Sequence, residues 1–165
     1  MFSEFTEALL SAEKSSMIPD EYDIFGRFCG SWKFKGDFMT GSGEIQTSEG
    51  EWLFSRILNG TAIQDIFIWP PRDQRRSDDV CGEYASSIFA YDPLSKKWDV
   101  TWVNTGSTVR LKAEKIGGNI IMTEITEKKM QWIFSDITDV SFRWQSVIHN
   151  DNGSKTLLAN LRAFR

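Results

Sequence analysis

Apolar and polar residues alternate along most of the chain from Ser31 onward, and this pattern is typical of antiparallel strands with one buried face. Turn residues, mainly Gly, Asn, Asp and Pro, separate the alternating segments. The pattern predicts ten strands, which span about residues 31–39, 43–58, 61–69, 85–91, 98–104, 107–116, 119–126, 130–136, 140–149 and 154–164. The one long connection, at 70–84, contains Pro70 and Pro71 and many charges.

The N-terminal segment has a different pattern. Phe2, Phe5 and Leu9 are spaced at i, i+3 and i+7, which predicts an amphipathic helix over residues 2–10. The segment has no other apolar surface of its own that could bury this stripe. We therefore expect the helix to lie over the mouth of the main fold as a lid, or against an apolar patch on its outer wall.

The segment 50–71 predicts a hairpin, because Asn59-Gly60 separates two apolar runs and this dipeptide is a strong hairpin signal. A two-residue turn fixes the cross-strand partners, which are Leu58–Thr61, Arg56–Ile63, Phe54–Asp65 and Trp52–Phe67. One face of this hairpin is then the most aromatic in the chain. The same face also carries Arg56 and Asp65 as diagonal neighbours, and Leu58.

The remaining hairpins place large side chains opposite small or apolar ones, as a packed sheet face requires. The predicted partners are Tyr91–Trp98, Trp98–Ala113, Val100–Leu111, Trp102–Val109, Ala113–Met122 and, in the C-terminal hairpin, Phe142–Leu161, Trp144–Ala159 and Ser146–Leu157. With these registers all seven tryptophans can point to one side. The other side is mixed polar, with some apolar residues, namely Leu53, Ile57, Ile66 and Ile68.

An up-and-down sheet of this size with one apolar face closes best as a barrel, which also leaves no exposed edge. The sequence therefore predicts an all-β, about ten-stranded antiparallel up-and-down barrel with a short N-terminal helix. Residues 1–165 form a single domain, in which residues 1–28 are a helical lid and a turn into the barrel, and residues 29–165 are the barrel. Ten strands enclose more space than side chains readily fill, so a residual cavity is expected.

Composition narrows the classes of function. The net charge of −4 argues against a general binder of nucleic acids or anionic membranes. The basic cluster from Arg72 to Arg76 is followed at once by Asp78 and Asp79, and we interpret it as a solvated loop. The single histidine, His149, excludes a histidine-dependent catalytic triad.

Cys29 and Cys81 stand far apart and match neither a metal-binding nor a redox motif. Because no spaced carboxylate set accompanies them, no metal site and no cofactor are expected. The N-terminus lacks the basic region of a signal peptide, and no apolar run approaches the roughly 20 residues that span a bilayer. We expect a cytoplasmic protein with reduced thiols and no membrane contact.

The tripeptide Gly30-Ser31-Trp32, at the start of the first strand, resembles the Gly-x-Trp motif of lipocalin and calycin barrels. The resemblance covers about residues 26–165. It implies that Trp32 closes one end of the barrel under a basic side chain from the last strand, either Arg162 or Arg165. In strand count and order the chain is similar to fatty-acid-binding proteins and nitrobindins, and to a loose group of bacterial lipocalin-like proteins of uncertain function.

The chain also differs from these families. Nitrobindins bind haem through a histidine near the C-terminus, but the predicted register places His149 on the outer face, where it is not expected to be a haem ligand. Secreted lipocalins carry a signal peptide and often a disulfide, and neither sign is present. Fatty-acid-binding proteins have paired helices between their first two strands, where this chain has turn residues.

Polar residues on the inward face are the candidates for chemistry, because a buried charge is costly unless it is paired. Arg56 and Asp65 either form one satisfied internal ion pair, or Arg56 binds a ligand carboxylate, phosphate or enolate while Asp65 orients it. Glu124, predicted opposite Leu111, is a second inward carboxylate. The expected ligand-binding residues are Arg56, Asp65, Trp52, Phe54, Phe67, Tyr91, Trp102, Trp132 and Trp144.

Two functions are compatible with these residues. The first is a protein that binds a small apolar or aromatic molecule, expected to be anionic because Arg56 orients it. The alternative is a cofactor-independent enzyme of cyclase, isomerase or decarboxylase type, in which Asp65 or Glu124 transfers a proton within the same cavity. The two differ in whether a carboxylate there has a raised pKa. Nucleic acid is not an expected partner, whereas a homodimer stays open.

Overall fold

The structure, a computed structural model, describes residues 1, 3–76 and 82–165. Its strands are β1 (Gly30–Met39), β2 (Ile45–Ile57), β3 (Ala62–Trp69), β4 (Glu83–Asp92), β5 (Lys97–Asn104), β6 (Ser107–Ile116), β7 (Asn119–Glu124), β8 (Met130–Ser135), β9 (Ser141–His149) and β10 (Lys155–Phe164). Its helical segments are α1 (Glu4–Leu9) and three short 3₁₀ turns, η1 (Asp20–Tyr22), η2 (Gly26–Phe28) and η3 (Arg72–Gln74).

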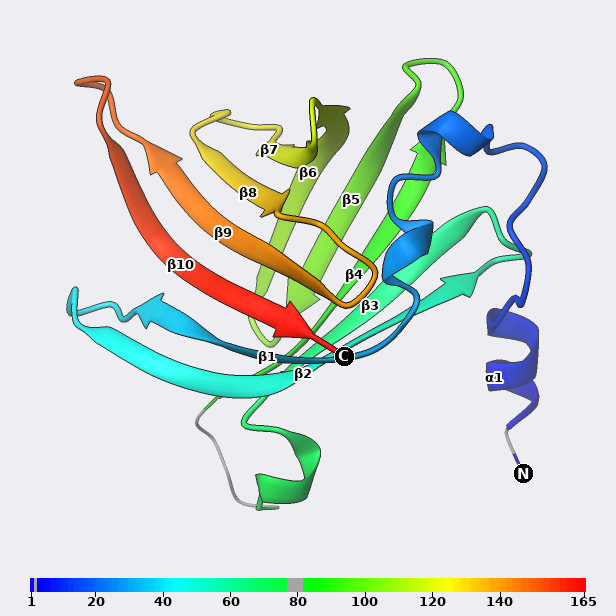
Figure 1. Cartoon of the computed structure of the whole chain (residues 1–165), viewed down its shortest axis with the longest axis horizontal. Helices are drawn as coiled ribbons and strands as arrows, with labels where there is room; N and C mark the ends of the chain where they lie inside the picture. Colours follow the sequence, from blue (N-terminus) through cyan, green and yellow to red (C-terminus); the bar gives the residue numbers. More distant parts are fainter. Residues whose placement is uncertain (2, 77–81) are drawn as a thin grey trace.

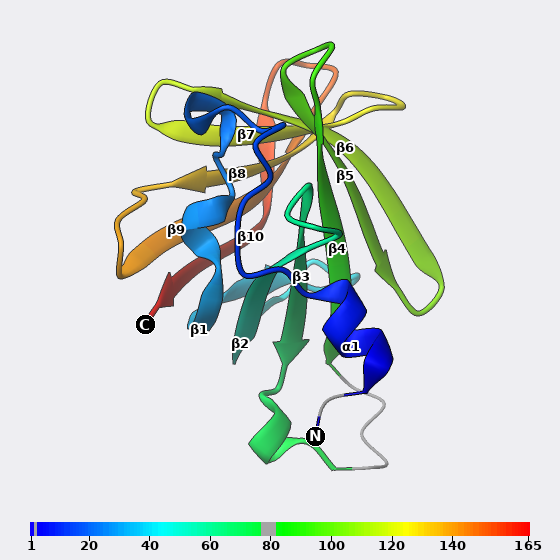
Figure 2. The same ribbon diagram turned by 90° about the vertical axis from the view of Figure 1, so that its right-hand side faces the viewer.

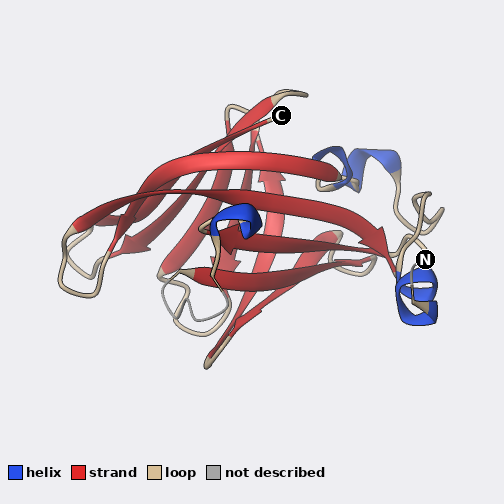
Figure 3. Cartoon of the chain, turned by 90° about the horizontal axis from the view of Figure 1, so that it is seen from below, coloured by secondary structure: helices blue, strands red, loops and turns tan. Residues whose placement is uncertain are grey.

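Each strand pairs with its neighbours in the chain, and β1 pairs with β10, so that the antiparallel sheet closes on itself (Figure 1). Figure 3 shows that strands make up most of the molecule. The predicted all-β, ten-stranded up-and-down barrel with a short N-terminal helix is confirmed. Its interior is one apolar cluster that includes tryptophans from six of the strands.

The hairpin of β2 and β3 has the predicted register. Trp52 lies opposite Phe67, and Phe54 lies opposite Asp65. The prediction that Leu58 faces inward is wrong, because the backbone of Leu58 takes a positive φ of 53° at the turn. Its side chain leaves the alternation of the strand and is 52% exposed.

The register predicted for β9 and β10 is wrong by two residues. Trp144 lies opposite Leu161 instead of Ala159, because the turn begins one residue later than predicted and a bulge between Leu157 and Ala159 adds a second residue. Between the turn and the bulge the shift is only one residue, so Leu157, predicted to lie opposite Ser146, lies opposite Val147 and is 43% exposed. Beyond the bulge the shift is two residues, and because side chains alternate with a period of two, the side chains there stay on their predicted face. Trp144 therefore still contributes to the interior.

Trp32 and Arg165 cap the end of the barrel at which β1 begins and β10 ends, which we call the closed end. The guanidinium carbon of Arg165 lies 4.1 Å from the centre of the Trp32 ring. Arg165 also donates hydrogen bonds to the carbonyl oxygens of Asp139 (2.8 Å) and Cys29 (3.0 Å). Of the two arginines that the Gly-x-Trp motif suggested, Arg165, the residue after β10, takes this place, whereas Arg162 lies within β10 and is exposed.

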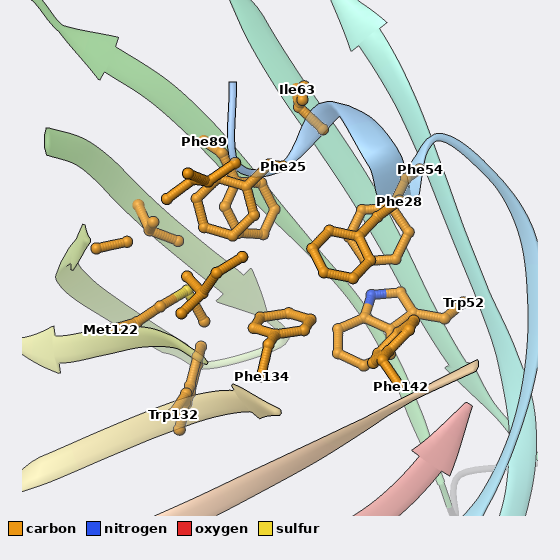
Figure 4. Packing of buried hydrophobic residues seen from close by; sticks show 14 of the residues in the cluster. Phe25, Phe28, Trp52, Phe54, Ile63, Phe89, Met122, Trp132, Phe134 and Phe142 are labelled. Carbon is orange, nitrogen blue, oxygen red and sulfur yellow. The ribbon is translucent and has the colours of Figure 1, made fainter. Parts of the chain in front are cut away.

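Residues 11–28, which we call the N-terminal strap, cross the closed end (Figure 2). The strap is tied to the β2–β3 hairpin, because the Ser11 amide donates to the Arg56 carbonyl oxygen at 3.0 Å. Its Phe25 and Phe28 are buried, and Figure 4 shows both rings among the aromatic side chains of the barrel. The Phe25 and Phe28 rings have their centres 6.1 and 4.9 Å from that of Phe134. The strap therefore plugs this end with aromatic side chains.

Helix α1 lies beside the barrel and not within it (Figure 2). None of its residues is buried, and Phe5 is 74% exposed. The predicted helix is confirmed, but its apolar stripe is not covered as expected; Phe2 lies outside the described residues. The segment that fills the barrel end is the strap that follows the helix. A gating role for residues 1–28 stays a prediction.

Candidate functional site

The barrel interior contains a cavity of about 470 Å³. Its floor includes Phe89 and Phe134, which also contact Phe25 of the strap. From there it extends toward the opposite end of the barrel, where Met39 and Met130 lie at strand ends. The other lining residues are Phe38, Trp52, Asp65, Phe67, Glu83, Ser87, Trp102, Val109, Met122, Trp144, Trp132, Ser146, Leu158 and Ala159.

Four indoles form much of the cavity wall. The Trp132 ring lies 5.8 Å from Trp102 and 5.7 Å from Trp144, and Trp144 lies 6.0 Å from Trp52, measured between ring centres. The ring planes of the Trp132–Trp102 and Trp144–Trp52 pairs are close to perpendicular. These rings therefore do not stack on each other, and they leave the cavity between them open. Their arrangement suits a flat molecule that makes contact with several ring faces or edges.

Asp65 is the deepest polar group of the cavity wall, with a residue exposure of 2%. Its two carboxyl oxygens each accept one hydrogen bond, Oδ2 from the Trp52 indole nitrogen at 2.9 Å and Oδ1 from the Ser87 amide at 2.5 Å. Burial raises the pKa of Asp65 to about 7, and hydrogen bonding from Trp52 and from the Ser87 amide and side chain offsets only part of the effect of burial. At neutral pH the group can therefore either give or accept a proton.

Glu83 is a second carboxyl on the cavity wall, and sequence analysis missed it. It is the first residue of β4 and accepts a hydrogen bond from the Asn104 side-chain nitrogen at 3.1 Å. Burial raises its pKa above the usual value. The strand was predicted to begin at residue 85, so Glu83 was assigned to the loop. The alternation of Glu83 with Ala85, Ser87 and Phe89 would have indicated an inward position.

The expected pair between Arg56 and Asp65 does not form. Arg56 lies near the closed end, where its guanidinium donates to both carboxyl oxygens of Asp23 in the strap, at 2.7 and 3.3 Å. It is not among the residues that line the cavity. The sequence pattern placed Arg56 on the inward face but could not show that a strap residue would reach it first. A role for Arg56 in orienting a ligand thus finds no support in its position.

Glu124 is opposite Leu111 as predicted, but it does not line the cavity. Its carboxylate accepts hydrogen bonds from the backbone amides of Thr126 (2.6 Å) and Glu127 (2.9 Å), and these bonds hold the next turn. Hydrogen bonding from the Thr126 side chain and amide, with the further amides of the turn, keeps the pKa of Glu124 below its usual value. A carboxylate held in this way is poorly suited to proton transfer in the cavity.

The predicted binding residues thus divide into two groups. Those that line the cavity are Trp52, Asp65, Phe67, Trp102, Trp132 and Trp144. Phe54 and Tyr91, like Arg56, lie outside the lining. The Phe54 ring packs against Phe28 of the strap at 5.7 Å between ring centres, and Tyr91 stacks on Tyr22 at 5.9 Å. Both therefore support the closed end.

The charge of the cavity wall is negative or neutral. Its charged side chains are Asp65 and Glu83, and no lysine, arginine or histidine occurs among the described residues that line it. The preference for an anionic ligand was based on Arg56, and this basis is lost. His149 lies at the far end of β9, where its Nε2 is 2.8 Å from the side-chain oxygen of Gln131.

Among residues 1, 3–76 and 82–165, no three His, Cys, Asp or Glu side chains gather closely enough to hold a metal ion. Within the same residues, no helix has the length and apolar character needed to cross a membrane.

Cys29 carries a free thiol, and Cys81 lies outside the described residues, as do Asp78 and Asp79. Arg72 of the predicted basic loop forms an ion pair with Glu51 at 2.9 Å.

No protein-family model matches the chain, and no curated protein matches it. Among solved structures, the chain is similar to the S-type phycobiliprotein lyase from Guillardia theta, with a TM-score of 0.55 and 10% sequence identity. The similarity covers 89% of this chain and 92% of that one. At such low identity it shows the fold alone, which is a closed ten-stranded antiparallel barrel.

Proposed function

We propose that this protein binds a flat, apolar or aromatic small molecule in the barrel cavity. The observation that carries the proposal is the cavity of about 470 Å³ with four indoles in its wall. An enclosed, mostly apolar cavity with a few polar groups is typical of small-molecule sites. The strap closes one end of the barrel, so the ligand enters from the opposite end, where Met39 and Met130 lie.

The fold neighbour supports the same kind of ligand. That protein is a phycobiliprotein lyase. A bilin, the pigment class in its name, is therefore a reasonable first natural compound to test. The four indoles of the cavity wall would contact the conjugated system of such a molecule. The proposal does not depend on a bilin, because the same wall suits other flat conjugated molecules.

Nile red, a flat and uncharged dye, is expected to bind in the cavity and to quench the intrinsic tryptophan emission. Trp102→Ala should weaken the dye affinity about fivefold, because it removes one aromatic contact worth roughly 1 kcal/mol. Trp98→Phe is the matched control, since Trp98 is buried but does not line the cavity. Absence of quenching, or equal weakening by both substitutions, would show that the indoles are packed core and not a binding wall.

A cofactor-independent enzyme is the second candidate, and the observation that favours it is Asp65. A carboxyl in an aromatic cavity with a pKa of about 7 is suited to general acid–base catalysis. In this reading Asp65 takes a proton from a carbon acid of the ligand and returns it at another position. The tryptophans hold the ligand flat, and the enclosed site keeps water away.

Proton transfer can be tested on a molecule that native mass spectrometry detects bound to the purified protein. After incubation in deuterated water, native mass spectrometry of the wild type should show carbon-bound deuterium in that molecule, retained after return to ordinary water. Asp65→Asn should retain the molecule without deuterium, because a neutral amide is too weak a base to take a proton from carbon. Equal labelling with both proteins would count against catalysis by Asp65 and leave the binding function.

A further inference from the structure

The ionisable groups of the cavity wall are both carboxyls, which accept hydrogen bonds when they are ionised. Asp65 and Glu83 contribute carboxyl oxygens, and no cationic side chain lines the cavity among the described residues. Their present partners are neutral donors, namely Trp52 and the Ser87 amide for Asp65, and Asn104 for Glu83. A buried carboxylate without a cation is costly. A ligand that donates hydrogen bonds would therefore be favoured here.

These acceptors still have capacity. Each carboxylate oxygen can accept two hydrogen bonds. Each oxygen of Asp65 receives one such bond from the groups named above, and Oε1 of Glu83 receives one from Asn104. The bonds from Trp52 and Ser87 hold the Asp65 carboxyl in place on the wall. A ligand donor can thus bind to a preorganised acceptor without displacing either of the existing partners.

The two carboxyls are also spaced along the cavity. Asp65 lies opposite Ser87, and Glu83 is four residues farther along the same strand, β4. At about 3.3 Å per residue, this places the two acceptors roughly 13 Å apart along the strand direction. Asp65 lies deep in the wall, whereas Glu83 is at the end of the barrel opposite the strap. An elongated molecule can reach both.

We infer that the cavity selects an elongated, conjugated ligand that presents nitrogen-bound hydrogens to Asp65 and Glu83, and that it discriminates against a carboxylate of the same shape. This inference rests on the proposed binding function and specifies its ligand class. The nitrogen-bound hydrogens belong either to a neutral N–H group or to a protonated nitrogen, and both complement a carboxylate. A ligand carboxylate would instead meet like charge in a desolvated site.

Matched three-ring probes test this inference, with affinities measured at pH 8 by displacement of Nile red. Carbazole has a ring N–H where fluorene has a CH₂ group, and carbazole should bind about tenfold more tightly than fluorene. The cationic 9-aminoacridine should bind at least tenfold more tightly than acridine-9-carboxylate. Tighter or equal binding of fluorene or of the carboxylate would overturn the inference. If Nile red itself did not bind, the proposed function would fail as well.

Variants assign the selectivity to the two carboxyls. Asp65→Asn should reduce the preference for 9-aminoacridine over acridine-9-carboxylate about tenfold, because it removes the charge and keeps the shape. Glu83→Gln should have the same direction of effect, and it serves alone if Asp65→Asn does not fold. Glu114→Gln is the control, since Glu114 pairs with Lys97 and does not line the cavity. Unchanged selectivity in both cavity variants would refute the assignment.

Discussion

The free energy of unfolding of the wild type is expected to fall by about 3 kcal/mol, relative to Asp65→Asn, as the pH rises from 4 to 7. Burial raises the pKa of Asp65 from 3.8 to about 7 in the folded state. Between these values the folded protein holds a proton that the unfolded chain releases. The contribution of Asp65 to the free energy of unfolding is therefore fully present below about pH 4. It is lost at about 1.36 kcal/mol per pH unit as the pH rises to about 7.

The measurement is urea denaturation of both proteins at several pH values. Carboxylates with lowered pKa, such as Asp92 and Glu51, give the opposite slope below about pH 4, but they contribute equally to both proteins and cancel in the difference. The amide of the variant has no ionisation, so only the wild type carries the Asp65 slope. A difference that stays constant from pH 4 to 7 would mean that Asp65 titrates as an exposed carboxyl.

Arg56→Met is expected to lower the free energy of unfolding by about 3 kcal/mol and to leave Nile red affinity unchanged. The substitution leaves Asp23 without its partner, and the side chains of the pair are only 14% and 16% exposed. Removal of one member of a buried pair costs roughly 3–5 kcal/mol, and the residual exposure favours the lower end. Binding should persist because Arg56 does not line the cavity.

A double-mutant cycle separates the ion pair from other effects of the arginine. Arg56→Met combined with Asp23→Asn should be less destabilised than the sum of the single variants, because the two side chains are in direct contact. Urea midpoints and dye titrations on the same samples give both quantities. If Arg56→Met instead lost dye affinity at unchanged stability, Arg56 would be a ligand-binding residue after all.

The fold could be predicted from the sequence because its signals are local. Alternation and turn residues fixed most strand bounds and the register of the β2–β3 hairpin, where Trp52 and Phe67 face each other as predicted. The register of β9 and β10 failed because a bulge after Leu157 has no clear mark in the residue types. Because the shift at Trp144 was two residues, the prediction that Trp144 faces inward was still correct.

The site could be predicted only in part, because it depends on contacts between distant segments. The alternation of side chains placed Asp65 and the tryptophans of the cavity wall on the inward face of the sheet, so they could be predicted as site residues. The partner of Arg56 was not, since Asp23 lies 33 residues earlier, in a strap whose path follows from tertiary packing. Glu83 was missed for a simpler reason, because it begins a strand beside a long polar loop.

The seam between β1 and β10 has a consequence for the order of folding. The other strand pairs join strands that follow one another in the chain, whereas the seam pairs Lys33 with Phe164 and Phe38 with Ala159, which are far apart in the sequence. Contacts so distant in the chain close a long loop and form slowly compared with hairpins. The cavity is lined from both sides of this seam, by Phe38 and Ala159, so it does not exist until the seam has formed. A ligand bound as proposed would therefore contact both strands of the seam, and it would stabilise the closed barrel against opening there.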